Sequence, residues 1–364
     1  MTQKAKPDMT SRTMFRIVLA WIACTVCIAA LHAQVVEVPV HIERLNPALD
    51  HIVPAQPRLE RVATGFTWLE GPVWIPRNGG YLLFADIPGN SIRKVLPNGA
   101  VSIFMQPSGY IDSAPFNGPQ PGSNGMTIDP HGRLVIAGNG ARNVFRLETI
   151  NPKAIQTVLA DSYQGKRLNS PNDLVFRSNG DLYFTDPPYG LPMQNDKDPH
   201  KQLTVNGLYL VRGAGSQKPG TPPNHAAIHL LVGDLSRPNG LALSPDEKYL
   251  YLDNTEPQKL WLRFRIKPDG TLTDRTVLAD ATADKRRGSP DGMKVDSFGN
   301  IYSAGPGGIW ILSPSGKHLG TIDTPEVVSN LAWGGSQLNV LYITTQSSVY
   351  SIRLKAHGIP MLRK

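Results

Sequence analysis

The sequence is poor in cysteine, in helical periodicity and in clustered charge. Only two of its 364 residues are cysteines, Cys24 and Cys27, and both lie in an N-terminal apolar run. The rest of the chain therefore cannot form disulfides, so its stability must come from an apolar core or from a metal. No convincing amphipathic helix follows residue 34, which argues against a parallel α/β fold.

Several functional classes are also disfavoured. The net charge of +8 is dispersed, and the tight basic run at 285–287 has no interleaved aromatic residues, so we expect a solvated loop and no nucleic-acid partner. The nine histidines form no HExxH-type pair. The chain also lacks a GxSxG nucleophile elbow and a P-loop.

Residues 1–33 have the layout of a secretory signal peptide. Four basic residues precede the fifteen-residue apolar run at 17–31, and Ala33 supplies a small residue at a cleavage point. The run is shorter than the roughly 20 residues that span a bilayer as a helix. We expect an exported protein, periplasmic or secreted, with no stable membrane association after cleavage; an uncleaved anchor is the alternative.

Glycine and proline are abundant, with 34 and 32 residues, and they punctuate a repeat. Each repeat is an apolar strand, a tight turn and a second strand. Six stretches begin such a unit: LEGPVW (69–74), SNGMTID (123–129), SPNDLVF (170–176), RPNGLALS (237–244), SPDGMKVD (289–296) and SNLAWGG (329–335). Their spacing is near that of four-stranded propeller blades, whereas a β-sandwich gives no reason for the repetition. We predict an all-β, six-bladed β-propeller over 34–364, with segments 35–45 and 348–355 completing one blade from both termini.

One position in every repeat carries a side-chain oxygen. The six residues are Glu70, Asn124, Asn172, Asn239, Asp291 and Asn330. Because innermost strands line the channel of a propeller, we expect these side chains at one height around its axis. Carboxylates and carboxamides without His or Cys suit a hard cation, Ca²⁺ first, with Mg²⁺, Mn²⁺ or Zn²⁺ as alternatives. For Asn124 and Asn330, capping of a local turn is an equal alternative.

Four motifs in order resemble the gluconolactonase branch of the senescence marker protein, gluconolactonase and luciferin-regenerating enzyme family. They are EGPVW, SPNDLVF…GDLYFTDPPYGL, PNGLALSPDEKYLYL and PDGMKVDSFGNIY, spread over about residues 60 to 350. The resemblance implies a six-bladed propeller with one divalent cation and hydrolysis of sugar lactones or related esters. It implies Glu70, Asn172, Asn239 and Asp291 as metal-site residues. It does not identify Asn124 or Asn330.

The expected reaction is opening of a small-molecule substrate, a sugar lactone, with the cation polarising its carbonyl and Asp291 acting as general base. We expect substrate contacts from Asn172, Asn124, Tyr189 and Arg142. The loops at 104–122 and 192–225 differ from those of the animal enzymes, so the resemblance does not identify which lactone is the substrate. Asp86, Asp186 and Asp253, which end second strands, are interpreted as turn caps rather than as a second acidic ring. The alternatives are a binding propeller with a structural metal, or an esterase or phosphotriesterase using the same site.

Overall fold

The computed structural model describes residues 35–360. Residues 1–34 and 361–364 lie outside the described residues, and with them the predicted signal peptide and both cysteines. A search of the described part of the chain finds no helix long and apolar enough to cross a membrane.

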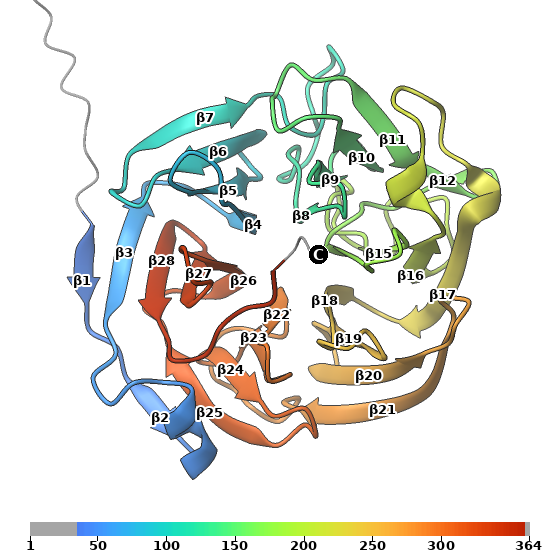
Figure 1. The fold of residues 1–364 in the computed structure, drawn as a ribbon. Helices are drawn as coiled ribbons and strands as arrows, with labels where there is room; N and C mark the ends of the chain where they lie inside the picture. The colour runs from blue at the N-terminus through green and yellow to red at the C-terminus, as the bar shows by residue number, and fades with distance from the viewer. Residues whose placement is uncertain (1–34, 361–364) are drawn as a thin grey trace, which may run out of the picture. The chain divides into compact units, whose positions relative to one another are not determined.

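Six antiparallel sheets are arranged in a ring, which confirms the predicted six-bladed β-propeller (Figure 1). Blade 1 consists of β4 (Leu69–Ile75), β5 (Tyr81–Asp86), β6 (Ser91–Val95) and β7 (Val101–Met105). Blade 2 consists of β8 (Met126–Ile128), β9 (Leu134–Gly138), β10 (Asn143–Leu147) and β11 (Gln156–Ala160). Blade 3 consists of β14 (Leu174–Phe176), β15 (Leu182–Asp186), β16 (Asn206–Val211) and β17 (Ile228–Leu235). Blade 4 consists of β18 (Pro238–Leu243), β19 (Tyr249–Asn254), β20 (Leu260–Ile266) and β21 (Leu272–Asp280). Blade 5 consists of β22 (Met293–Val295), β23 (Ile301–Gly305), β24 (Gly308–Leu312) and β25 (His318–Asp323). Blade 6 consists of β26 (Val328–Gly334), β27 (Val340–Thr345), β28 (Ser348–Arg353) and β3 (Leu59–Thr64).

Short elements complete the fold. A hairpin of β12 (Ser162–Tyr163) and β13 (Lys166–Arg167) follows blade 2. Three 3₁₀ turns, η1 (Pro47–His51), η2 (Ala214–Ser216) and η3 (His225–Ala227), lie in connections, and residues 35–360 contain no α-helix.

Both chain ends close the ring, although the closing strand differs from the expected one. In blade 6, β28 pairs with β3, and β1 (Val36–Val38) adds a fifth strand outside β3. The expected segment 35–45 is divided, because β2 (Ile42–Arg44) joins β25 of blade 5. Pro39 follows β1 directly and has no N–H for a ladder hydrogen bond, so the strand ends there and the chain crosses to the next blade.

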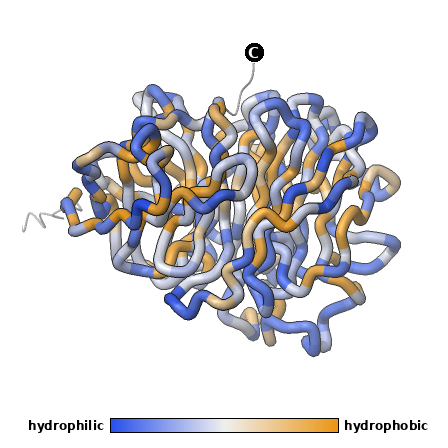
Figure 2. Tube along the Cα trace, turned by 90° about the horizontal axis from the view of Figure 1, so that it is seen from below, coloured by the Kyte–Doolittle hydropathy of each residue, from blue (hydrophilic) through white to orange (hydrophobic). Residues whose placement is uncertain are grey.

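Strand alternation produces a core between every pair of neighbouring blades. In β9, Val135 and Ala137 pack toward blade 3, whereas Leu134 and Ile136 pack toward blade 1. Successive residues of a strand point to opposite faces of the sheet. A blade that packs between two neighbouring blades is therefore apolar on both of its faces. Six such apolar clusters occupy the six junctions between blades. Figure 2 shows these hydrophobic strand segments in the interior and hydrophilic loops at the two ends of the blades.

The antiparallel order sorts the loops into two faces. Leu69 at the start of β4 pairs with Asp86 at the end of β5, and Asp86 pairs with Ser91 at the start of β6. The second-to-third-strand loops and the loops between blades therefore share one end, which we call the ring face. The opposite end is the C-terminal face, where Gly358 forms a bridge with Asp296. The expected loop at 192–225 is two loops on opposite ends, because β16 separates them.

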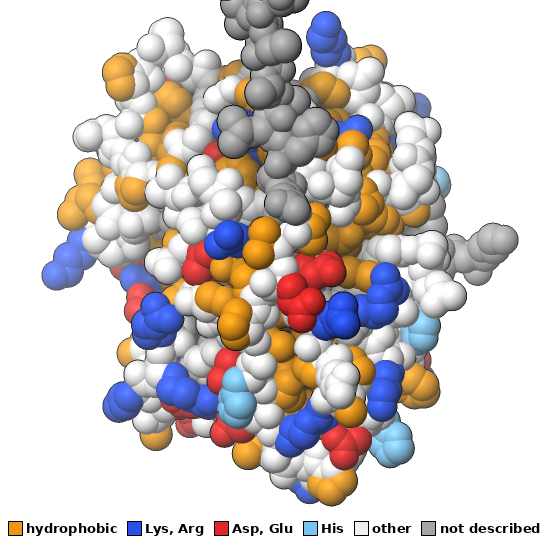
Figure 3. All heavy atoms as spheres, turned by 90° about the vertical axis from the view of Figure 1, so that its left-hand side faces the viewer, with side chains coloured by type: hydrophobic (Ala, Val, Ile, Leu, Met, Phe, Trp, Pro, Cys, Tyr) orange, Lys and Arg blue, Asp and Glu red, His pale blue; other side chains and the backbone are white. Residues whose placement is uncertain are grey.

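Surface charges are mixed rather than gathered. In the view of Figure 3, Lys and Arg side chains alternate with Asp and Glu side chains. Within the basic run, Arg286 forms ion pairs with Asp284 at 2.7 Å and with Glu43 at 3.0 Å. The central residue of the run is therefore paired with acidic neighbours.

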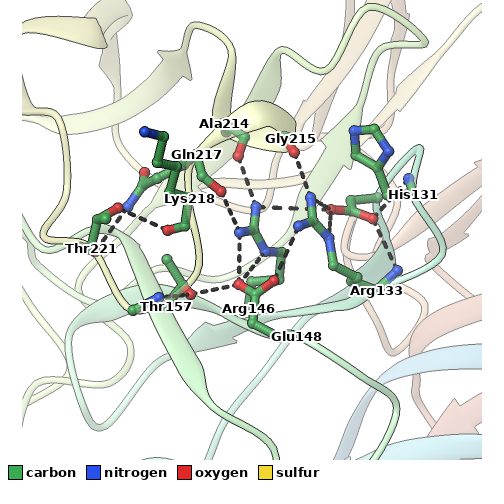
Figure 4. Close-up of polar contacts among 12 residues, drawn as sticks. His131, Arg133, Arg146, Glu148, Thr157, Ala214, Gly215, Gln217, Lys218 and Thr221 are labelled. Carbon is green, nitrogen blue, oxygen red and sulfur yellow. Dashed lines mark hydrogen bonds and ion pairs between the residues drawn. The ribbon is translucent and has the colours of Figure 1, made fainter.

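One buried charge network ties blade 2 to the η2 turn of blade 3 (Figure 4). The Arg146 side chain is fully buried and donates to Glu148 Oε1 at 2.9 and 2.7 Å. Its remaining donors reach the carbonyl oxygens of Ala214 at 3.0 Å and Gln217 at 2.7 Å. Arg133 contacts Glu148 at 3.1 Å from the other side. Every charge in this network has a partner, so it is structural.

Replacement of Arg146 by Met should lower the free energy of unfolding by about 3–5 kcal/mol, because Glu148, whose side chain is only 12% exposed, would lose its main partner. Denaturant unfolding measures this change. Arg58→Met is the control, since the Arg58 side chain is 76% exposed and lies 3.8 Å from Glu37; its effect should stay within about 0.5 kcal/mol. Similar losses in both variants would contradict the structural role.

Candidate active site at the propeller axis

All six repeated oxygen-bearing residues lie near the start of innermost strands, either in the first residues of the strand or two residues before it. We call them the ring residues: Glu70, Asn124, Asn172, Asn239, Asp291 and Asn330. The five other than Asp291 are at most 3% exposed. Asp291 as a whole residue is partly exposed, although its carboxyl group is buried enough to raise its pKa.

Glycines after the ring residues let neighbouring inner strands approach. A Cβ on Gly71 would fall less than 3.0 Å from the backbone oxygen of Asn124 in the next blade. Gly125 has the same relation to Asn172, and Gly240 to Asp291. The Gly125 N–H also donates to the Asn172 carbonyl at 2.7 Å. The short motif of a ring residue followed by Gly is therefore a packing requirement that brings the ring side chains together.

Gly240→Ala should destabilise the protein by about 3 kcal/mol, because the added methyl would overlap a backbone oxygen that cannot move alone. Gly233→Ala in β17 is the matched control: its nearest neighbours are the side chains of Leu230 and Val205, 3.3 Å or more away. Its effect should be below about 1 kcal/mol. Chemical denaturation of both variants tests the requirement, and equal losses would refute it.

Three ring oxygens are buried without a hydrogen-bond partner. They are Oδ1 of Asn124, Asn172 and Asn239. The Asn239 amide nitrogen donates to Thr255 Oγ1 at 3.1 Å. This bond orients the carboxamide and leaves its oxygen without a hydrogen-bond partner. Buried acceptors without partners cost free energy, and this cost is removed when a cation or another donor binds.

Asn330 differs from the other carboxamides. Its oxygen accepts hydrogen bonds from the Leu331 N–H at 2.8 Å and from Lys294 Nζ at 3.2 Å. Its amide nitrogen donates to Glu70 Oε2 at 3.2 Å and to Asp173 Oδ2 at 3.4 Å. Asn330 is thus a donor toward the carboxylates, and its own oxygen is already used.

Two carboxylates that the sequence analysis did not assign to the site, Asp173 and Asp253, also belong to the cluster. Burial raises the pKa of Glu70 to about 7, and the Asp173 charge adds to the rise. Burial and the charges of Glu70, Asp253 and Asp173 raise the pKa of Asp291 well above its usual range. Contrary to the prediction, Asp253 does not cap its own turn. One of its oxygens accepts the N–H of Gly240 in the neighbouring strand at 3.0 Å, and Oδ2 is buried without a partner.

The donor set fits a hard cation. No group of three or more His, Cys, Asp and Glu side chains within 35–360 has a metal-binding arrangement, so carboxamide oxygens are needed to complete a site. Unpartnered oxygens of Asn172 and Asn239, with the carboxylates of Glu70 and Asp291, supply such ligands. Burial is the first cause of the raised pKa values of Glu70 and Asp291, and the charges of neighbouring carboxylates add to the rise. A cation bound among these groups would favour their ionised forms.

The two other strand-ending aspartates have structural roles. Asp186 accepts the N–H groups of Asn169 at 2.8 Å and Ser170 at 2.7 Å. These groups lie in the segment before β14, so Asp186 joins two segments of blade 3 and, contrary to the prediction, does not cap its own turn. Asp86 instead contacts Arg93 at 3.4 Å.

The two expected loop contacts behave differently. Burial raises the pKa of Tyr189, the Thr255 hydroxyl opposes the rise, and the Asp291 charge adds to it. Tyr189 therefore lies near Asp291 on the ring face. Arg142 donates through Nε to the Leu168 carbonyl at 2.8 Å and lines another pocket with Arg167, so its role in substrate binding stays a prediction.

Known proteins with similar sequences indicate the family to which the chain is related. Residues 68–347 match the family model described as the SMP-30/Gluconolactonase/LRE-like region. A gluconolactonase from Zymomonas mobilis is 37% identical over 326 residues, 87% of this chain and 87% of that protein. A 6-deoxy-6-sulfogluconolactonase from Pseudomonas putida is 35% identical over 152 residues, 41% of this chain and 51% of that protein.

A solved gluconolactonase from Xanthomonas campestris shares the fold with a TM-score of 0.71. The two are 28% identical, and the match covers 88% of this chain and 97% of that one. The fold and the family suggested by the sequence motifs are therefore both confirmed.

Proposed function

Because this chain belongs to the SMP-30/gluconolactonase/LRE-like family, we propose that it hydrolyses sugar lactones at the ring residues with one divalent cation. The observation that carries the proposal is the set of three buried, unpartnered carboxamide oxygens beside two carboxylates. Relatives named gluconolactonase and sulfogluconolactonase support a lactone as the substrate class.

Glu70, Asn172, Asn239 and Asp291 would hold the cation, with Ca²⁺ the first choice for an all-oxygen set. When bound, the cation supplies Lewis-acid polarisation of the lactone carbonyl. Asn330 is excluded from this set, since its oxygen is already engaged by Lys294 and Leu331.

Asp291 is the proposed general base. Its Oδ1 accepts the Gly292 N–H at 3.1 Å, which leaves Oδ2 to take the proton from the attacking water. Its partial exposure suits this role, whereas Glu70 is buried and bonded to Gly71 and Asn330. We further propose that Tyr189, beside Asp291, and Asn124, between Glu70 and Asn172 in the ring order, bind substrate oxygens.

Asp291→Ala should reduce metal-dependent kcat/KM on glucono-1,5-lactone by about 10²–10⁴-fold, because both the base and a ligand are lost. The assay uses residues 34–364 loaded in turn with Ca²⁺, Mg²⁺, Mn²⁺ and Zn²⁺ at saturating concentration, with spontaneous hydrolysis subtracted. Asp112→Ala, an exposed carboxylate on the ring face, is the matched control and should retain activity.

A folded, metal-loaded protein that stays at background on every sugar lactone would refute the proposal. Turnover of aryl esters or phosphotriesters would then assign the site to another ester class. Ligand binding without turnover would assign it to a binding propeller.

We also propose export, on the sequence of residues 1–33 alone. Expression of the full chain should give a periplasmic or secreted product whose N-terminus lies near Gln34, as measured by N-terminal sequencing of fractions. An intact N-terminus in the membrane fraction would favour the uncleaved anchor.

A further inference from the structure

Lys294 brings a positive charge to the cluster of carboxylates. It lies in β22, three residues after Asp291. Its ammonium donates to the Met293 carbonyl at 2.8 Å and to Asn330 Oδ1 at 3.2 Å, and it lies 4.0 Å from Asp173 Oδ2. This placement puts the ammonium directly behind the ring residues.

The cluster needs such a charge. Glu70, Asp173, Asp253 and Asp291 act on one another through their charges, and the Asp173 side chain is 2% exposed. Lys294 is the basic side chain that acts on both Glu70 and Asp253. Buried carboxylates without a nearby cation are costly, because neither solvent nor a partner stabilises the charge.

Lys294, whose side chain is 28% exposed, also lines a mainly apolar cavity that includes Arg177 and Glu247. This cavity of about 180 Å³ is lined by the innermost strands, including Trp74, Met126 and Trp333, and by Ile359 of the C-terminal segment. Lys294 is the lining residue shared between this cavity and the carboxylate cluster. Its aliphatic stem can pack among apolar side chains while its ammonium reaches the carboxylates.

We propose that Lys294 is a tethered counter-ion of the ring: it stabilises the carboxylates when the divalent cation is absent, and it lowers their affinity for that cation. The first half follows from attraction between opposite charges. The second follows from repulsion between the ammonium and a divalent cation held by the same cluster. Only the second half rests on the proposed function.

A competing role makes the opposite prediction. Lys294 fixes the Asn330 oxygen, and the Asn330 amide donates to Glu70. If this chain of hydrogen bonds served only to orient Glu70, loss of Lys294 would weaken divalent-cation binding. The sign of the change in affinity therefore separates charge compensation from orientation.

The first experiment compares Lys294→Met with Lys294→Arg. In chelator, where no divalent cation is bound, Lys294→Met should unfold at least about 5 °C below the wild-type protein, because the carboxylates lose the Lys294 ammonium. In calorimetric titration with Ca²⁺, its Kd should fall by about tenfold or more. Lys294→Arg keeps the charge, so both quantities should stay near wild-type values. Unchanged unfolding of Lys294→Met in chelator, or a raised Kd, would overturn the proposal.

A second variant tests the charge directly. Lys294→Ala leaves space beside the apolar cavity for a short alkylammonium ion. Propylammonium should raise its unfolding temperature in chelator, whereas Lys294→Met, which fills the space, should not respond. Equal stabilisation by 1-propanol would show that the lost side chain acts through volume, and no response to the amine would also count against a counter-ion.

The outcomes also separate this inference from the proposed function. A wild-type protein that binds none of the divalent cations would refute the metal site. The unfolding of Lys294→Met in chelator would still decide whether Lys294 stabilises the carboxylates.

Discussion

The site depends on how closely the innermost strands approach one another at the ring. The Gly125 N–H donates to the carbonyl of Asn172, and Gly240 leaves room for the backbone of Asp291. These backbone contacts fix the ring side chains at one height, with little freedom to separate. The apolar clusters between blades hold the strands in the same places from outside.

This rigidity forces carboxylates together that would separate in a flexible site. Burial raises the pKa of Glu70 to about 7, and the nearby charge of Asp173 adds to that rise. The fold therefore holds negative charges close together, and the Lys294 ammonium, 4.0 Å from Asp173 Oδ2, partly balances them. Such pre-organisation is what a cation site requires, since ligand repulsion is already overcome during folding.

The sequence predicted the parts of the site that follow the repeat. Six aligned stretches were enough for the blades and for the ring residues, since each repeat places its first inner residue alike. Asp173 was missed although it carried a signal: it follows Asn172 where four of the other repeats have Gly. Lys294 and the engaged oxygen of Asn330 were missed for another reason, because their contacts join β22 to other blades and depend on the closed ring. The division of 35–45 between two blades likewise depends on which sheet edges remain open.

Charge balance also bears on how the proposed reaction would end. With all four carboxylates ionised, the Lys294 ammonium and one divalent cation leave the cluster with a net charge of about −1. A lactone is neutral, so this charge does not repel it, whereas ring opening creates a carboxylate in the same space. The product carboxylate would meet the four negative charges as well as the cation, whereas the substrate carries no charge for them to repel. An acidic ring balanced to about −1 would therefore admit a neutral ester without charge repulsion.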